Sequence, residues 1–243
     1  NLTATLVGEH FSENDDRARS TKQLCTRDNG PSVVDGPAGP QVPNIINANF
    51  LSQGCAPGPL YGPTAFQTPS AGAIPFVVAL ESYGAYIPNG LNPYAGLNQS
   101  QDLRTIDSII DPKYRAKNDT IELNADYNIT PTLTLTSQTG FNKDSLYSTE
   151  DYNRFNTTTG LFSTDTGFNK YFIGTDGEFC DPQLGCSSRL VGEDLSQERA
   201  QQFSQEVRLA SNFSGPLNFS VGANYLHYQT VEDYYVFINA ISF

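Results

Sequence analysis

Residues 198–237 read ERAQQFSQEVRLASNFSGPLNFSVGANYLHYQTVEDYYVF, and this stretch decides the fold. It consists of two segments in which apolar and polar residues alternate, joined by the turn sequence Ser214-Gly215-Pro216. A period of two over about 15 and 20 residues predicts two antiparallel strands, far longer than the usual strand of about 5–6 residues. The face shared by the apolar positions carries Phe203, Val207, Leu209, Phe213, Leu217, Phe219, Val221, Ala223 and Tyr225. Such long strands joined by a short turn are typical of a membrane-spanning β-hairpin.

A second hairpin of the same kind precedes it. Residues 120–129 read TIELNADYNI, Thr130-Pro131 supplies the turn, and the chain returns as TLTLTSQTGF. Apolar residues again occupy alternate positions, with acidic and amide side chains between them. A soluble β-sandwich, whose strands also alternate, is the alternative reading.

The connections differ greatly in length. We predict strands at about 1–13, 119–129, 132–147, 199–213 and 217–237, with long connections at 14–117 and 148–198. The first long connection is rich in Pro and Gly, although residues 73–80 favour a short strand and 99–110 a helix. Membrane barrels have short periplasmic turns and long extracellular loops, so we expect both long connections outside the cell.

Composition excludes several classes of protein. The net charge of −12 argues against nucleic-acid binding, which needs a basic surface. The acids gather mostly outside the predicted strands, as a solvated surface would require. No phosphate-binding glycine loop, catalytic triad or zinc cluster is recognisable, so neither enzymatic activity, a cofactor nor a metal is expected. The chain begins at Asn1 and contains no Met, which suggests part of a longer protein.

Four cysteines lie in the two long connections, at Cys25, Cys55, Cys180 and Cys186. An even number in loop-like sequence indicates disulfides formed in an oxidising compartment. Three pairings are possible. We favour Cys180–Cys186, which closes a small loop, and this leaves Cys25 with Cys55.

Two stretches resemble a known family. QQFSQEVRLASNFSGPLNFSVGANYL (201–226) and NDTIELNADYNITPTLTLTSQTGFNKDSLYSTEDYNRF (118–155) are similar to barrel strands of TonB-dependent outer-membrane receptors of Gram-negative bacteria. The resemblance covers both hairpins but includes no residue that identifies a solute.

The resemblance implies a segment of an all-β, antiparallel transmembrane β-barrel in the cell outer membrane. In the family, 22 strands surround an N-terminal plug, and neither the plug nor the closing strand has a counterpart here. The implied function is energised uptake of an iron chelate, cobalamin or an oligosaccharide. Its partners are outer-membrane lipid and, through the plug, the inner-membrane TonB complex. The alternative is a secreted or surface β-rich protein that binds a partner or assembles into fibres, since an isolated sheet has open edges.

Two groups of residues are candidates for binding. The polar rows of the strands would face the lumen, where they bind a polar solute or the plug, or simply hydrate and pair: Glu122, Asn124, Asp126, Asn128, Glu206 and Arg208. An aromatic and basic cluster near a strand end would contact the solute or pack at the membrane interface: Tyr147, Tyr152, Arg154 and Phe155.

Overall fold

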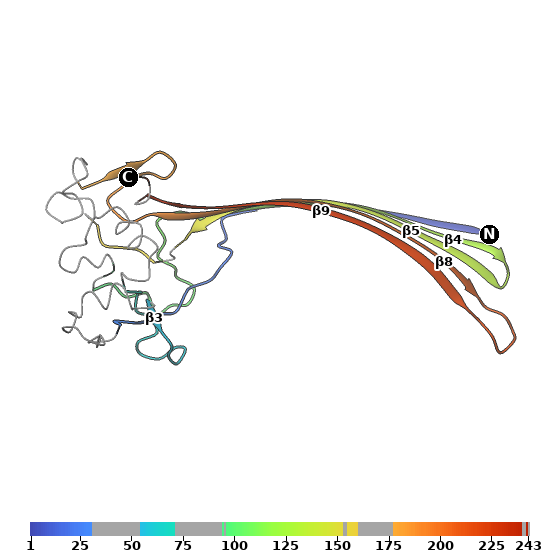
Figure 1. Cartoon of the computed structure of the whole chain (residues 1–243), viewed down its shortest axis with the longest axis horizontal. Helices are drawn as coiled ribbons and strands as arrows, with labels where there is room; N and C mark the ends of the chain where they lie inside the picture. The colour runs from blue at the N-terminus through green and yellow to red at the C-terminus, as the bar shows by residue number, and fades with distance from the viewer. Residues whose placement is uncertain are drawn as a thin grey trace, which may run out of the picture. The chain divides into compact units, whose positions relative to one another are not determined.

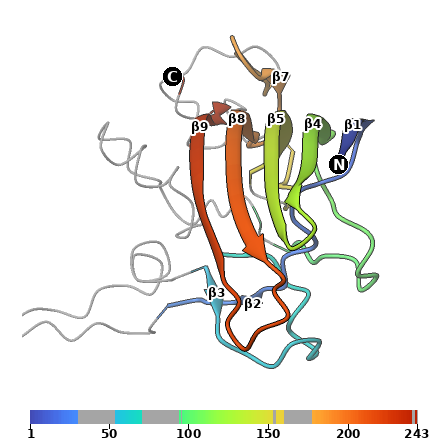
Figure 2. The same cartoon turned by 90° about the vertical axis from the view of Figure 1, so that its right-hand side faces the viewer.

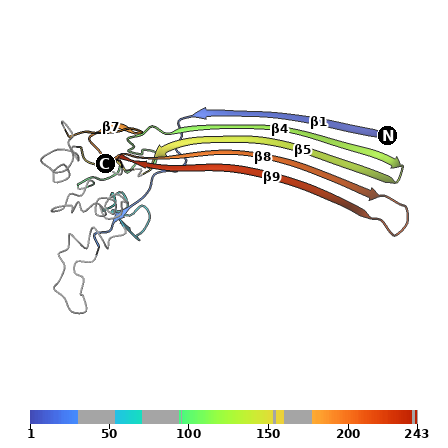
Figure 3. The same ribbon diagram turned by 45° about the horizontal axis from the view of Figure 1, so that its top comes forward.

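Five long strands make up most of the regular structure of the chain. The computed structural model describes residues 1–30, 54–70, 94, 96–152, 155–159, 177–239 and 242. One antiparallel sheet has the order β1-β4-β5-β8-β9 (Figure 3). Its strands are β1 Leu2–Asp15, β4 Lys113–Thr130, β5 Leu133–Asp151, β8 Gly192–Ser211 and β9 Ser220–Ile238. The prediction of an all-β, antiparallel fold is therefore confirmed. No helix suited to crossing a membrane occurs among the described residues.

Most strands extend beyond the alternating stretches from which they were predicted. β4 begins at Lys113 and β8 at Gly192, several residues before the expected starts at 119 and 199. The added residues pair through their backbones with the neighbouring strand, for example Lys113 with Thr149. In β4 the added residues on the face of Ile121 are Lys113, Arg115 and Lys117, so no apolar face marks this part of the strand.

The register decides which residues of neighbouring strands share a face of the sheet. Residues directly opposite each other in an antiparallel pair project to the same face. Leu6 of β1 lies opposite Leu123 of β4, which lies opposite Thr139 of β5. The ladder between β4 and β5 has one irregularity, between Asn128 and Thr130 beside the turn. Most apolar positions of neighbouring strands thus share one face, although Val7 and Phe11 of β1 lie on the polar face.

The connection between β8 and β9 is longer than predicted. The strands stop at Ser211 and resume at Ser220, because Asn218 closes the turn with its side chain. Its Oδ1 accepts the backbone N–H of Phe213 at 2.6 Å, and its Nδ2 donates to the carbonyl of Phe213 at 3.1 Å. This turn and the β4–β5 turn lie at the same end of the sheet, called here the turn end (Figure 1). Figure 2 shows the sheet from this end.

The chain divides into two compact units. The strand unit comprises Asn1–Arg17, Pro112–Thr149 and Leu195–Tyr235, and the connection unit Ala18–Asp111, Glu150–Asp194 and Val236–Phe243. The connection unit contains two small two-stranded sheets, β2 (Thr26–Arg27) with β3 (Cys55–Ala56) and β6 (Phe179–Asp181) with β7 (Gly185–Ser187). Its core includes Cys25, Ala65, Tyr94, Leu190, Val191 and Ile238.

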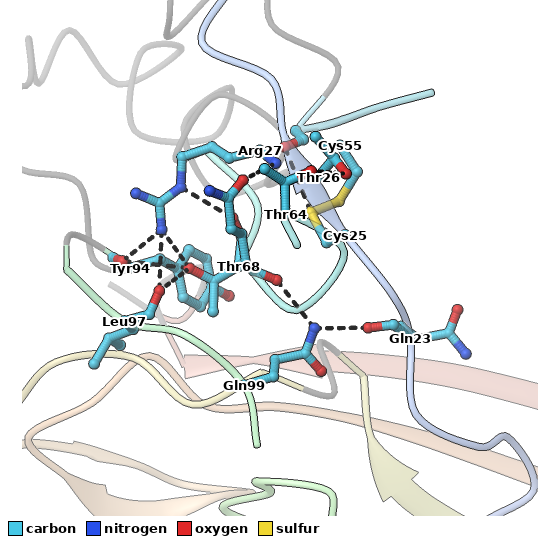
Figure 4. Close-up of a disulfide and its surroundings, with 12 residues drawn as sticks. Gln23, Cys25, Thr26, Arg27, Cys55, Thr64, Thr68, Tyr94, Leu97 and Gln99 are labelled. Carbon is cyan, nitrogen blue, oxygen red and sulfur yellow. Dashed lines mark hydrogen bonds between the residues drawn. A yellow bond between two sulfur atoms is a disulfide. The ribbon is translucent and has the colours of Figure 1, made fainter. Parts of the chain in front are cut away.

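Both predicted disulfides are present. Cys25, which directly precedes β2, is bonded to Cys55, the first residue of β3 (Figure 4), and Cys180 is bonded to Cys186, which lies directly opposite it in the β6–β7 pair. The predicted helix at 99–110 is wrong. The Asp102 carboxylate accepts the Arg104 backbone N–H at 2.9 Å and the Thr105 hydroxyl at 3.2 Å, which makes a local turn instead. The predicted strand at 73–80 lies outside the described residues.

Candidate functional site: the two faces of the sheet

One face of the strand unit exposes large apolar side chains in every strand. Leu6 of β1 is 71% exposed and Val221 of β9 is 60% exposed, although both belong to paired strands of the sheet. The other exposed members of this face include Leu2, Ile121, Leu123, Tyr127, Phe141, Phe203, Val207, Phe219 and Tyr225. Soluble monomers rarely expose a continuous apolar patch of this extent. No described residue of the strand unit covers this face.

Aromatic side chains mark both edges of the apolar face. Near the turn end lie Tyr127, Phe213 and Phe219, with the two Phe rings 6.1 Å apart. Toward the other end lie Phe141, Phe203 and Tyr225, with the last two rings 6.3 Å apart. Between these edges the face carries smaller side chains such as Ala125, Val207 and Ala223. Tyr and Phe are the residues that line the two interfaces of membrane barrels.

The width of the apolar face can be compared with a bilayer. On β4 it runs from Ile121 to Ile129, eight steps of roughly 3.4 Å, or ~27 Å along the strand. A strand tilted by roughly 40° then covers ~20 Å of membrane depth. The stretch from Phe203 to Phe213 covers ~26 Å by the same estimate. The apolar band of outer-membrane barrels is about 25 Å tall.

Gln205 is the most polar side chain inside this face, and its amide is paired. Thr139 donates its hydroxyl to Gln205 Oε1 at 2.7 Å, and Gln205 Nε2 donates to Ser137 Oγ at 3.0 Å. A polar group facing hydrocarbon needs such lateral partners, because lipid offers none. Charged side chains begin only beyond Ile121 and Phe141, at the opposed pair Asp119 and Lys143.

The opposite face holds the predicted polar rows. Asp126 Oδ1 accepts the hydroxyl of Thr136 at 2.6 Å, and Asn128 Oδ1 that of Thr134 at 2.9 Å. Asn124 donates to Glu122 Oε1 at 2.8 Å within the same row. These residues therefore pair largely with one another across β4 and β5.

A shallow hollow of about 430 Å³ lies on this polar face. Its lining includes Glu122, Gln138, Gly140, Ser204, Glu206 and Asn224. Arg208 projects to the same face but is exposed, and no described ion pair joins it to Glu206. A hollow lined by carboxylates, amides and hydroxyls suits a polar or cationic group, or a covering polypeptide.

The aromatic and basic cluster is not one described site. Tyr147 belongs to the strand unit, where the Arg115 guanidinium lies 5.9 Å from the centre of its ring. Tyr152 and Phe155 belong to the connection unit, and the ring of Phe155 meets that of Tyr94 edge to face at 6.3 Å. Arg154 lies outside the described residues.

An arginine in the connection unit has a role that sequence reasoning missed. The Arg27 side chain donates to Thr68 O at 3.0 Å, to Thr68 Oγ1 at 2.6 Å and to the carbonyls of Tyr94 and Leu97 at 3.2 and 3.3 Å (Figure 4). One guanidinium thus ties together three segments that are distant in sequence, next to a disulfide. No sequence pattern marks it, because its acceptors are mainly backbone carbonyls.

The connection unit also buries acids. Arg19 forms an ion pair with Asp194, and Ser20 donates its hydroxyl to Glu150 at 3.0 Å. Asp151 accepts the backbone N–H of Ile109 at 3.0 Å. Burial raises the pKa of the Tyr94 phenol well above its usual value, and the nearby Asp151 carboxylate raises that pKa further. The described residues contain no cluster of His, Cys, Asp and Glu suited to a metal ion.

No protein-family model matches this chain, and neither does any curated protein or solved structure compared with it. The functional argument therefore rests on the two faces of the sheet.

Proposed function

We propose that the sheet forms part of the wall of a transmembrane β-barrel in the outer membrane of a Gram-negative bacterium. The observation that carries this proposal is the uncharged apolar band that crosses all five strands on one face only. A soluble sandwich would bury that face against a second sheet. In the described part of the strand unit, no second sheet is present.

The sheet cannot span a bilayer alone. β1 and β9 each have one edge without a partner strand in the described sheet. Backbone N–H and C=O groups must all be paired within hydrocarbon, so only a closed barrel is stable there. Further strands, from the same protein or from other chains, would complete the barrel. With the turn end in the periplasm, the connection unit and both disulfides belong outside the cell.

The proposed activity is uptake of a scarce nutrient by a receptor similar to the TonB-dependent family. The support is the resemblance of both hairpins, together with the polar hollow opposite the apolar face. Iron chelates, cobalamin and oligosaccharides are the solute classes that the resemblance implies. An energising inner-membrane TonB complex, acting through a plug, is the proposed partner.

Accessibility to lipid tests the first part of this proposal. Nitroxide labels would be placed singly at consecutive positions 221–226 of the full-length protein in bilayers. Oxygen, which concentrates in lipid, should relax labels at Val221, Ala223 and Tyr225 most strongly. A water-soluble nickel chelate should relax labels at Gly222, Asn224 and Leu226 instead. Equal access of the nickel chelate to both sets would contradict a membrane-spanning sheet.

Uptake tests the second part. Cells carrying the full-length protein should accumulate one labelled solute from a panel of ferric chelates, cobalamin and oligosaccharides, and a proton uncoupler should stop the accumulation. A protein that inserts into membranes but supports no uncoupler-sensitive accumulation of any panel member would contradict the receptor proposal. Recovery as soluble fibres would favour the assembly alternative, which the open strand edges support.

A further inference from the structure

Cationic side chains gather on the apolar face just beyond the band, at the end away from the turns. Lys113, Arg115 and Lys117 occupy alternate positions of β4 and therefore share this face with Ile121. Lys143 follows Phe141 on β5, and Arg199 precedes Phe203 on β8, each on the same face. All five side chains are exposed. They are called the basic patch below.

The position of Arg199 follows from contacts between β5 and β8. Asn212 donates its backbone N–H to Thr132 O, and Thr139 bonds to Gln205 farther along the same pair of strands. Both contacts fit one unshifted antiparallel register, which places Arg199 beside Ser145. Ser145 lies opposite Lys117 on its other side.

Ser145 thus lies at the centre of the basic patch. Lys117 and Arg199 flank it across the sheet, and Lys143 lies two residues away on its own strand. Neighbours in such positions have Cβ atoms roughly 5–7 Å apart. The hydroxyl and these cationic groups can therefore converge on one tetrahedral anion.

The basic patch runs against the charge of the whole chain, which is −12. On the polar face of the same strands, Arg208 is basic, and acidic side chains are far more numerous. These acids include Glu9, Glu13, Asp15, Glu122, Asp126, Asp144, Glu198, Glu206 and Glu232. Lysine and arginine side chains of these strands therefore gather mainly on the face of the basic patch, where Asp119 and Asp233 are acids of the same face.

Asp119 lies beside the basic patch, directly opposite Lys143, but its described ion pair is with His10. Arg115 donates to Asn14 Oδ1 at 3.1 Å and stacks near Tyr147, so it too lacks a described acidic partner. Exposed cations at the rim of an apolar band are attracted to the anionic headgroups of an adjoining lipid leaflet.

We propose that the basic patch binds the phosphate groups of lipid headgroups in the outer leaflet, with Ser145 and its three cationic neighbours as the central site. This inference rests on the proposed membrane location. Each cation near an anionic lipid surface strengthens binding by roughly five-fold.

The test compares lipid A with dephosphorylated lipid A, both fluorescently labelled, titrated against the full-length protein in neutral detergent micelles. The protein should prefer the phosphorylated lipid. The triple variant Lys117→Gln, Lys143→Gln, Arg199→Gln should weaken its binding by roughly 100-fold. The matched control Arg208→Gln changes the charge on the opposite face and should leave binding unchanged. If the triple variant does not assemble, the three single variants replace it, each with an expected loss of about five-fold.

Three results would overturn the inference: equal affinity for both lipids, equal losses in the triple variant and the control, or displacement of lipid A by millimolar inorganic phosphate. Assembly of each variant in membranes is measured in parallel. A protein that never enters membranes contradicts the proposed function, whereas one that enters but ignores lipid phosphate contradicts this inference alone.

Discussion

Ile121 of β4 lies directly opposite Phe141 of β5, and the next pair on the same face, Asp119 and Lys143, is charged. The two pairs are separated by a single repeat of the strand, about 7 Å. The change from apolar to ionic side chains is therefore abrupt and occurs at the same level in both strands. Such a boundary is expected where a sheet passes from hydrocarbon into a headgroup region.

Two glycines on the polar face should respond differently to the same substitution. A Cβ at Gly222 would lie 2.8 Å from the backbone oxygen of Val207, whereas a Cβ at Gly140 would meet the Ser204 hydroxyl at 2.8 Å. A hydroxyl can rotate away, but the backbone of a paired strand cannot. Gly222→Ala should therefore cost about 1–3 kcal/mol and Gly140→Ala clearly less. Denaturant unfolding of the assembled full-length protein measures both, and equal losses would contradict the close approach of β8 and β9.

Arg27 should be central to the stability of the connection unit. Arg27→Ala removes the donors to Thr68, Tyr94 and Leu97, and we expect a loss of about 2–4 kcal/mol in unfolding free energy. Arg27→Lys should recover only part of it, because an ammonium lacks the planar fork of a guanidinium. Protection from thermolysin reports the change.

The matched control is Arg104→Ala, since Arg104 is exposed in the same unit and no described side-chain bond depends on it. Equal protease sensitivity of the two alanine variants would show that the contacts of Arg27 carry no special stability.

Tyr94 makes the stability of the connection unit sensitive to alkaline pH. Its phenol is fully buried, and burial, helped by Asp151, raises its pKa above the usual value of about 10. The folded form therefore holds the neutral phenol, while the unfolded chain ionises it above about pH 10. The stability that the neutral phenol of Tyr94 contributes is fully present below about pH 10 and declines as the pH rises further.

Tyr94→Phe should flatten this decline between pH 9 and 11.5, as measured by denaturation midpoints. Tyr61→Phe, at a position 63% exposed in the same unit, is the control and should leave the decline unchanged. Identical pH profiles for wild type and Tyr94→Phe would contradict the buried, neutral phenol.

The sequence allowed the sheet to be predicted because alternation records which face each strand residue occupies. Along Lys113–Asp119 the face that is apolar farther on carries charged side chains, so the alternation gives no apolar face there and the strand was predicted too short. Asn218 was placed in a strand because a side chain that replaces backbone bonds leaves no periodic trace.

The candidate site was only partly accessible from sequence. The polar rows were predicted, since Glu122, Asn124 and Asp126 alternate with apolar neighbours. The basic patch was not, because Lys117, Lys143 and Arg199 come together only through the register of three strands. The contacts of Arg27 were likewise invisible, because its acceptors lie far away in the chain.

The most direct measurement of the central claim is the amount of assembled barrel in membranes when arginine is placed on either face. Leu135→Arg and Val221→Arg put a charge in the apolar band, whereas Thr136→Arg and Asn224→Arg put the same charge on the polar face. The proposal predicts a cost of about 2–4 kcal/mol for the first pair, seen as a marked loss of assembled full-length protein, and near-normal assembly for the second. Unchanged membrane assembly of Leu135→Arg and Val221→Arg, or recovery of the protein in soluble folded form, would contradict a lipid-facing sheet.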